Sequence, residues 1–251
     1  MTDSVLNSII IGWMLVAVIS FFYLLRKPAP YGRYAAPGWG RQMDARVGWI
    51  IMESPALAVM LAYLLYYFRT LDDMTLWLML LYIGHYTYRA LIYPFRLRNT
   101  VKKTSAVVVG SAVFFNLVNA NLLGYSFTYV ADYPPDIGFE TSFQTGAMLF
   151  FVGIWFNIKS DNRLIRLRKE SPQAYVIPYG WLYRWVSCPN YLGEMIEWTG
   201  FALMAQHLAS WSFVVWTVAN LLPRALLHHQ WYLRTFPDYP ERRKAVIPYL
   251  L

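Results

Sequence analysis

Hydrophobic residues follow one another in seven long runs along the chain, and polar or charged residues bound each run. The runs cover residues 5–25, 47–68, 73–95, 105–124, 142–160, 190–207 and 210–233. An α-helix needs about 20 residues to cross the hydrocarbon core of a bilayer, and these runs reach or approach that length. An isolated strand would expose its backbone groups to lipid, so each run is predicted to be helical. The pattern predicts an all-α, polytopic membrane protein with seven transmembrane helices.

The connections between the runs alternate in charge. The third connection, "RLRNTVKK", is basic, as are the first and the fifth, whereas "RTLDD" and "YVADYPPDIGFE" in the second and fourth are acidic. Lys and Arg accumulate on the cytosolic side of membrane proteins, so we expect an outside N-terminus and a cytosolic C-terminus. The first run follows the acidic start "MTDS" and precedes Arg26 and Lys27, the reverse of a secretory signal, and is expected to stay as a span.

Composition supports a membrane location. Of the residues, 57% are hydrophobic and only 14% are charged, and the chain has 11 Trp and 20 Tyr, residue types that gather at membrane interfaces. The net charge of +8 lies between the apolar runs and forms no basic stripe, so we expect a bilayer and no nucleic acid as partner. We predict one integral, multi-pass membrane domain over residues 1–251. A bacterial inner membrane and an endoplasmic reticulum membrane fit equally, and a monomer is compatible with the sequence.

Several polar residues stand inside the predicted spans. A charge near the bilayer centre costs at least about 2.5 kcal/mol, so such residues usually have a function or a partner. Asn190, Glu194 and Glu197 share one helix face, and the two acids could also simply neutralise Arg224. Other residues at helical spacing form further stripes: Asn157, Asp161 and Arg168; Arg224, His228 and Tyr232; and Tyr86, Arg89 and Tyr93, with Glu53 in the second run. We expect these stripes to line a cavity in the cytosolic half.

The residue types narrow the chemistry. The chain has no GxGxxG after a strand, no Walker loop, no HExxH and no paired CxxC, and the adjacent His228 and His229 face different directions on a helix, so no metal site is expected. Guanidinium groups bind phosphates and carboxylates accept from ribose hydroxyls, so the stripes favour a nucleotide-like cofactor held without the usual fold.

Longer motifs point to a family. The stretches "GHYTYRALIYP", "SCPNYLGEMIEWTGFAL" and "RALLHHQWYLRTFPDYPERRKAVIPYLL" resemble the steroid 5-alpha-reductase (3-oxo-5-alpha-steroid 4-dehydrogenase) family, as a bacterial-type member. The resemblance covers nearly the whole chain. It implies a seven-helix fold in which about residues 1–125 form the substrate pocket and about residues 142–251 bind NADPH. By matching motif, it implies cofactor contacts from eight residues: Asn157, Asp161, Arg168, Asn190, Glu194, Arg224, His228 and Tyr232.

The resemblance also implies an activity, the NADPH-dependent reduction of the 4,5 double bond of a 4-ene-3-oxo steroid. Glu53 and Tyr86 match the pair that holds the substrate's 3-oxo group, and the residue before the acid, more often Gln in the family, is Met52 here. Hydride delivery to carbon 5 builds enolate charge on that oxygen, so a donor is needed. Tyr86 can donate, and a Glu53 buried in apolar surroundings would keep its proton and donate as well. The family's arginine after the third helix corresponds to either Arg96 or Arg98.

Two other enzyme classes remain open. A long-chain enoyl-thioester reductase shares the C-terminal half and NADPH, although Glu53 with Tyr86 favours a steroid. A membrane methyltransferase that binds S-adenosylmethionine usually ends in an Arg followed by paired Glu, whereas this chain reads "RALLHHQWYL". A transporter with a polar conduction path is a third class and would consume no cofactor.

Overall fold

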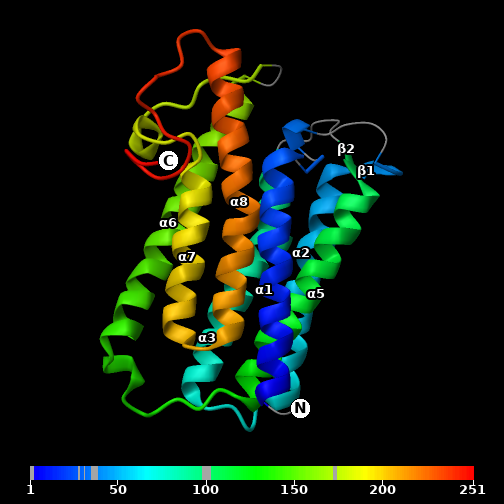
Figure 1. The fold of residues 1–251 in the computed structure, drawn as a ribbon, viewed down its shortest axis with the longest axis vertical. Coiled ribbons are helices and arrows are strands. Elements are labelled where there is room, and N and C mark those ends of the chain that lie inside the picture. Colours follow the sequence, from blue (N-terminus) through cyan, green and yellow to red (C-terminus); the bar gives the residue numbers. More distant parts are fainter. Residues whose placement is uncertain (1–2, 28, 31, 35–38, 98–102, 172–173) are drawn as a thin grey trace. The chain divides into compact units, whose positions relative to one another are not determined.

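The computed structural model describes residues 3–27, 29–30, 32–34, 39–97, 103–171 and 174–251 (Figure 1). Helices occupy each of the seven predicted runs, and the prediction of a mostly helical chain is confirmed. Their bounds are α1 Asp3–Arg26, α2 Ala45–Tyr67, α3 Asp73–Thr87, the π-helical turn η2 Tyr88–Ile92, α4 Tyr93–Arg96, α5 Ala106–Tyr129, α6 Thr141–Glu170, α7 Pro189–Ala205 and α8 Leu208–Thr235. Short 3-10 turns lie at Gly32–Tyr34, Ile137–Phe139 and Trp181–Arg184.

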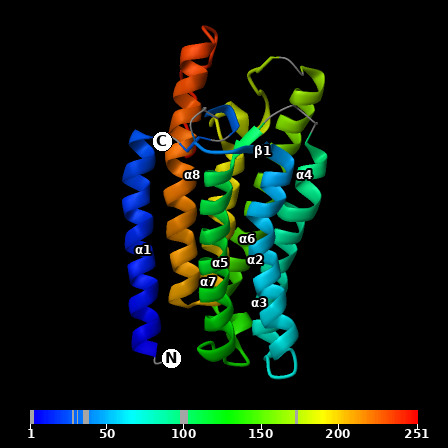
Figure 2. The ribbon, with the colours of Figure 1, turned by 90° about the vertical axis from the view of Figure 1, so that its right-hand side faces the viewer.

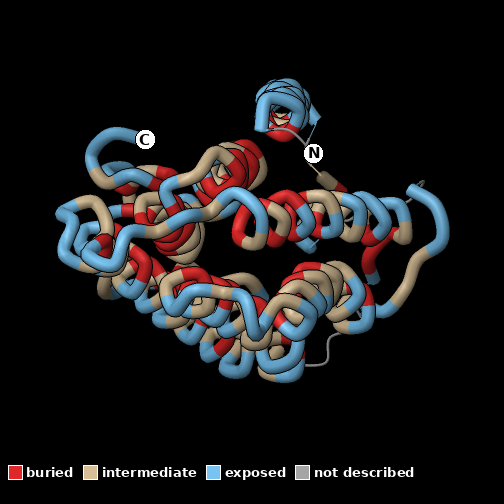
Figure 3. The backbone as a smooth tube through the Cα atoms, turned by 90° about the horizontal axis from the view of Figure 1, so that it is seen from below, coloured by how far each residue is buried: buried red, intermediate tan, exposed pale blue. Residues whose placement is uncertain are grey.

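Three helices of the described chain, α1, α2 and α5, are both long and apolar enough to cross a membrane. On α1 most apolar side chains are exposed, among them Ile19 at 69%, and Figure 3 shows most of its tube in pale blue. Exposed apolar side chains of this density suit contact with lipid. The crossing of all seven segments and their orientation stay predictions.

The chain forms two compact units. The first unit comprises Met1–Ile10, Ala29–Gly138 and His207–Ala209, and the second comprises Ile11–Pro28, Phe139–Gln206 and Ser210–Leu251. Glu53 and Tyr86 belong to the first unit, whereas all eight residues expected to bind the cofactor belong to the second. The residues expected to contact the steroid and those expected to contact the cofactor therefore lie on different units of the structure.

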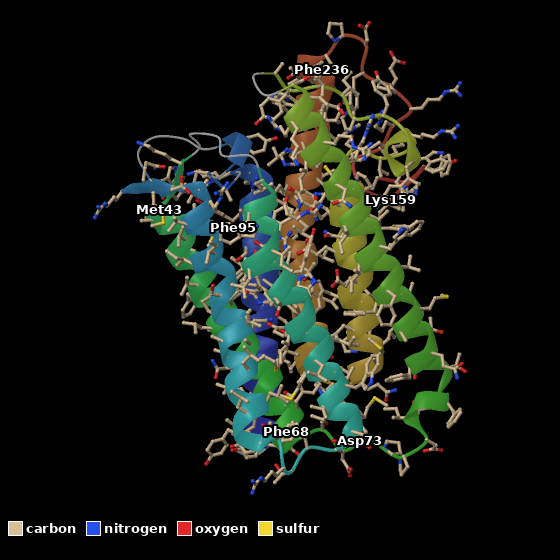
Figure 4. All side chains as sticks on the ribbon, turned by 180° about the vertical axis from the view of Figure 1, so that it is seen from behind. Met43, Phe68, Asp73, Phe95, Lys159 and Phe236 are labelled. Carbon is tan, nitrogen blue, oxygen red and sulfur yellow. The ribbon has the colours of Figure 1, made fainter. Side chains whose placement is uncertain are left out.

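In the first unit, α2 packs against α3 and α5 (Figure 2). A small antiparallel sheet pairs β1 (Gln42–Asp44) with β2 (Lys103–Ser105), with Met43 opposite Thr104. Asp44 then caps α2, because its carboxylate accepts from the backbone N–H groups of Arg46 and Val47. Figure 4 shows Met43 and Phe95 at one end of this unit and Phe68 and Asp73 at the other.

In the second unit, α6 and α7 touch backbone to backbone along a seam of glycines (Figure 1). A Cβ on Gly193 would lie 2.5 Å from the backbone nitrogen of Asn157, and one on Gly146 would lie 2.7 Å from the carbonyl oxygen of Gly200. Gly153 faces the backbone of Glu197 in the same way. Because real Cβ contacts are longer, only glycine permits this approach, which brings polar side chains on either side of the seam within reach of one another.

Helix α6 continues ten residues past the predicted end at residue 160. The apolar run ends there, but the polar stretch from Asp161 to Glu170 keeps helical spacing, with Ile165 buried and Arg168 in the last turn. Basic side chains in a last turn also stabilise the carbonyl end of a helix. The hydropathy pattern thus marks where apolar side chains end and does not mark where the helix ends.

Candidate active site

The glycine seam joins four of the predicted cofactor residues into one cluster. The amide nitrogen Nδ2 of Asn157 on α6 donates to the backbone oxygen of Asn190, at 3.1 Å, and approaches Oε2 of Glu194, at 3.3 Å. Nδ2 of Asn190 donates to Oδ1 of Asp161, at 3.1 Å. Asn157 and Asp161 are 4% and 3% exposed, so their polar groups lie inside the second unit. The structure thus brings these four residues together across two helices, and their role as cofactor contacts stays a prediction.

Arg224 and His228 meet α7 through a residue that the sequence analysis did not single out. Nε of Arg224 donates to the hydroxyl of Tyr191, at 3.1 Å, and the same hydroxyl lies 3.3 Å from Nε2 of His228. The rings of Tyr191 and His228 are stacked, with centroids 6.0 Å apart. Pro223 precedes Arg224 and removes one backbone donor from α8.

Arg168 and Tyr232 are held in aromatic contacts. The guanidinium of Arg168 lies 3.7 Å from the ring centroid of Tyr175, and that ring packs edge-on against Trp231. The buried ring of Tyr232 stacks on Tyr239, with centroids 5.0 Å apart. Both residues therefore have fixed positions on the second unit, set by aromatic neighbours from outside the stripes.

The segment after α8 is hydrogen-bonded to the residues that precede α7. Oγ of Ser187 lies 2.7 Å from Nδ1 of His229 and 2.6 Å from the hydroxyl of Tyr239, and it donates to the backbone oxygen of Lys244. Arg243, which is 2% exposed, donates to the backbone oxygen of Pro178. Burial raises the pKa of Tyr239, and the hydrogen bond with Ser187 opposes this increase. These contacts fix the turn that leads into Asn190.

The two predicted substrate residues lie on neighbouring helices of the first unit. Glu53 belongs to α2, and Tyr86, which is 4% exposed, belongs to α3. The ring of Tyr86 lies 4.6 Å from that of Tyr82, whose hydroxyl is fully buried, as is the side chain of Asn119 on α5. Tyr86 therefore belongs to a buried polar group that extends to α5.

The surroundings of Glu53 differ from the expectation. Nη2 of Arg89 lies 3.7 Å from Oε1 of Glu53, and the two side chains are 12% and 17% exposed. The expectation of purely apolar surroundings is therefore wrong, because the guanidinium of Arg89 stands beside the Glu53 carboxyl group. Arg89 was predicted only as a neighbour of Tyr86 on one stripe, since residue spacing says nothing about contacts between helices.

A partly buried histidine follows α7. Nε2 of His207 lies 3.1 Å from the hydroxyl of Tyr133, and Phe127 packs edge-on against the imidazole ring. Burial lowers the pKa of His207 to about 4 and raises that of Tyr133. Both groups are therefore neutral at pH 7.

The second unit has the donors and acceptors that a dinucleotide needs. Asp161 and Glu194 offer carboxylate oxygens for ribose hydroxyls, and the guanidinium groups of Arg168 and Arg224 offer charge for phosphates. The described residues include no group of three His, Cys, Asp or Glu side chains placed to hold a metal ion. Arg98, the alternative to Arg96 as a cofactor residue, lies outside the described residues.

Tyr191 and Tyr175 are the site residues that sequence analysis missed. Tyr191 is one position beyond Asn190, which rotates it by about 100° to the face that meets α8. Tyr175 stands in the connection between α6 and α7, where no periodicity indicates which residue faces the helix. Residue spacing gave no signal for Tyr191, because its contacts with Arg224 and His228 depend on how α7 packs against α8.

Comparisons with known proteins identify the family of the chain. Residues 102–251 match the family described as 3-oxo-5-alpha-steroid 4-dehydrogenase. The chain is 38% identical over 229 residues to steroid 5-alpha-reductase DET2 of Arabidopsis thaliana, covering 88% of this chain and 87% of the relative. It is 34% identical over 240 residues to 3-oxo-5-alpha-steroid 4-dehydrogenase 1 of Bos taurus, covering 94% and 93%. It is 35% identical over 227 residues to the type 2 protein of Mus musculus, covering 89% of each chain. The chain therefore belongs to the 3-oxo-5-alpha-steroid 4-dehydrogenase family of oxidoreductases.

Proposed function

We propose that this protein reduces the 4,5 double bond of 4-ene-3-oxo steroids to 5-alpha-3-oxo steroids, with NADPH as the reductant. Membership of the steroid reductase family supports the reaction class. The observation that carries the cofactor proposal is the buried cluster of Asn157, Asp161, Asn190 and Glu194, which joins α6 to α7 inside the stretch that matches the family.

The proposed cofactor contacts divide by chemistry. Asp161 and Glu194 accept from the sugar hydroxyls, while the two asparagines orient these carboxylates through the hydrogen bonds that join α6 to α7. Arg168 and Arg224 offset phosphate charge, and His228 is held for the same ligand by Tyr191. Tyr232 forms part of the wall of the proposed cofactor pocket. NADPH, when bound, supplies the hydride for carbon 5.

The first unit supplies the contacts to the steroid. As the hydride reaches carbon 5, negative charge builds on the 3-oxo oxygen until a proton reaches carbon 4. The hydroxyl of Tyr86 donates a hydrogen bond to this oxygen, and the carboxyl group of Glu53, in its protonated form, donates a second one. A preorganised donor of this kind contributes about 3 kcal/mol in the transition state, more than in water, because the buried site excludes solvent.

We further propose that all seven helical segments cross the bilayer, with the N-terminus outside and the C-terminus cytosolic, in a monomeric enzyme. The charge alternation of the connections supports this orientation. In a Cys188→Ser background, a cysteine at Asp136 should react with an impermeant maleimide added to intact cells, whereas one at Arg234 should react only after lysis. Labelling of Arg234→Cys in intact cells would contradict the orientation.

The first experiment measures steroid reduction by the purified protein in detergent. Testosterone or progesterone is incubated with NADPH, and the product is identified by mass spectrometry, with Glu53→Gln in parallel. We expect the 5-alpha-dihydro product from the wild type and much less from the variant. Tight NADPH binding without steroid turnover would redirect the proposal to enoyl-thioesters. Absence of NADPH binding would contradict the reductase proposal and make S-adenosylmethionine the next ligand to test.

A further inference from the structure

A widened helical turn follows Tyr86 and carries Arg89. In η2 the backbone N–H of Tyr93 donates to the oxygen of Tyr88, five residues earlier, instead of four. Pro94 comes next, and its ring cannot sit against the carbonyl of Ala90 in a regular helix, which explains why the turn widens here. Such single π-turns occur frequently at functional sites.

Two aromatic rings confine the side chain of Arg89. Its guanidinium carbon lies 4.8 Å from the ring centroid of Trp49 and 5.2 Å from that of Tyr93. Nε1 of Trp49 also donates to the backbone oxygen of Arg89, at 3.0 Å, so the same residue holds both ends of the arginine. The two rings are themselves neighbours, with centroids 5.4 Å apart, and a planar guanidinium that lies against both has few alternative positions.

The partner of Arg89 is equally fixed. Pro55 interrupts the hydrogen-bond ladder of α2 just after Glu53, and Nδ2 of Asn116 on α5 donates to the backbone oxygen of Met52, at 2.6 Å. Met52, which stands where the family more often has Gln, is thus held in place through its backbone. Because this backbone is held from α5, the Glu53 side chain starts from a defined place and reaches Arg89 at 3.7 Å.

We propose that Arg89 is a positioning residue, which acts through Glu53 to hold its carboxyl group toward the 3-oxo oxygen of the steroid. This inference rests on the proposed function. Without the Arg89 guanidinium, the Glu53 side chain loses the neighbour that fixes its direction and can turn away from the steroid. The loss of Arg89 therefore reproduces the loss of a correctly placed Glu53, although Arg89 itself donates nothing to the substrate.

A double-mutant cycle tests this coupling. The variants Glu53→Gln, Arg89→Gln and Glu53→Gln/Arg89→Gln are compared with the wild type for kcat and for the separate KM values of steroid and NADPH. We expect Arg89→Gln to lower kcat/KM for steroid by about tenfold, a typical coupling for residues in contact. The KM of NADPH should change by no more than about twofold, because Glu53 and Arg89 belong to the first unit and the proposed cofactor residues belong to the second. The double variant should be no worse than Glu53→Gln alone.

A matched control removes another ring-stacked arginine from α2. Arg46 lies over Phe95, at 5.8 Å, but donates to the backbone oxygen of Leu97 and contacts no acid through that bond. Arg46→Gln should keep the wild-type kcat and both KM values. The variant Arg89→Lys, which retains the charge but not the planar stack, should recover part of the activity lost in Arg89→Gln.

Several outcomes would overturn the inference. If the losses of the two single variants multiply in the double variant, Arg89 acts independently of Glu53. The same conclusion follows if Arg89→Gln has wild-type kinetics or if it raises only the KM of NADPH. If Arg89→Gln does not fold, the cycle is repeated with Glu53→Asp and Arg89→Lys, where multiplying losses again contradict the coupling. A wild type that reduces no 4-ene-3-oxo steroid would instead refute the proposed function, and this inference with it.

Discussion

Different kinds of contact hold the side chains of the two candidate sites in place. In the second unit, glycines let the α6 and α7 backbones touch, and the short side chains of Asn157 and Asn190 then bond across the seam. In the first unit, the long side chain of Arg89 is placed by the rings of Trp49 and Tyr93 and reaches Glu53 at a distance beyond a hydrogen bond. The proposed cofactor site depends on contacts between backbones, so we expect a small change of shape to harm it most. The proposed substrate site depends on side-chain chemistry, so we expect the loss of single polar atoms to harm it most.

The largest effect expected on chemistry comes from Tyr86→Phe. The ring still fills its buried place, but the donor to the 3-oxo oxygen is lost, so kcat/KM for steroid should fall about 100-fold. Steady-state kinetics with NADPH at saturation measure the change. Tyr66→Phe is the control, since Tyr66 is 81% exposed on α2 and should have wild-type kinetics. Unchanged turnover by Tyr86→Phe would show that Tyr86 contributes through the shape of its ring and not through its hydroxyl group.

A change of shape without a change of polarity should harm the second unit. The new Cβ of Gly193→Ala meets the backbone of Asn157, which cannot yield as a side chain would, so the variant should lose about 2 kcal/mol of unfolding free energy. It should also weaken NADPH binding, measured by fluorescence titration alongside thermal unfolding in detergent. Gly12→Ala, on α1 in the same unit, has nothing within 4 Å of its new Cβ and should be neutral or slightly stabilising. Equal stability of both variants would refute the role of the seam.

Removal of a charge from the second unit should affect the cofactor alone. Arg224→Ala removes a guanidinium expected beside phosphate, so the KM of NADPH should rise about tenfold while the KM of steroid changes little. Arg234→Ala removes an exposed arginine from the last turn of the same helix and should leave both constants unchanged. Parallel increases in both Michaelis constants would contradict the division between the units.

The smallest effect concerns pH. Because burial lowers the pKa of His207 to about 4, the folded protein binds fewer protons than the unfolded chain between that pH and about 6.5. Stability is therefore lost as the pH falls through this window, by about 0.8 kcal/mol at pH 6. Thermal unfolding of the wild type and His207→Gln between pH 8 and pH 5 measures the difference. A variant that loses as much stability as the wild type would exclude His207 as the source.

Much of the helical framework could be predicted, because long apolar runs leave the backbone few alternatives to a helix. The end of α6 could not, since residues 161–170 are polar yet helical. The three-residue strands β1 and β2 are also too short to leave a pattern. Periodicity therefore locates helices, and it underestimates those that continue beyond the apolar run.

The candidate sites were predictable to a different extent. The spacing of polar residues on α6 and on α7 predicted that Asn157 and Asn190 could face a common ligand. In the structure, each of these two residues donates a hydrogen bond across the seam. The contact of Glu53 with Arg89 and that of Tyr191 with Arg224 depend on how separate helices pack. A single sequence records spacing along one helix but not the rotation of one helix against another. The contacts between helices therefore had to come from the structure.

The glycine seam also limits how the gene can change in length. A deletion of one residue between Gly146 and Asn157 would turn the preceding half of α6 by about 100° and move its glycines off α7 together. No single substitution would restore the contact, because each glycine of the seam has its own backbone neighbour. We therefore expect α6 and α7 to tolerate many exchanges of side chain on their outer faces but no insertion or deletion along the seam.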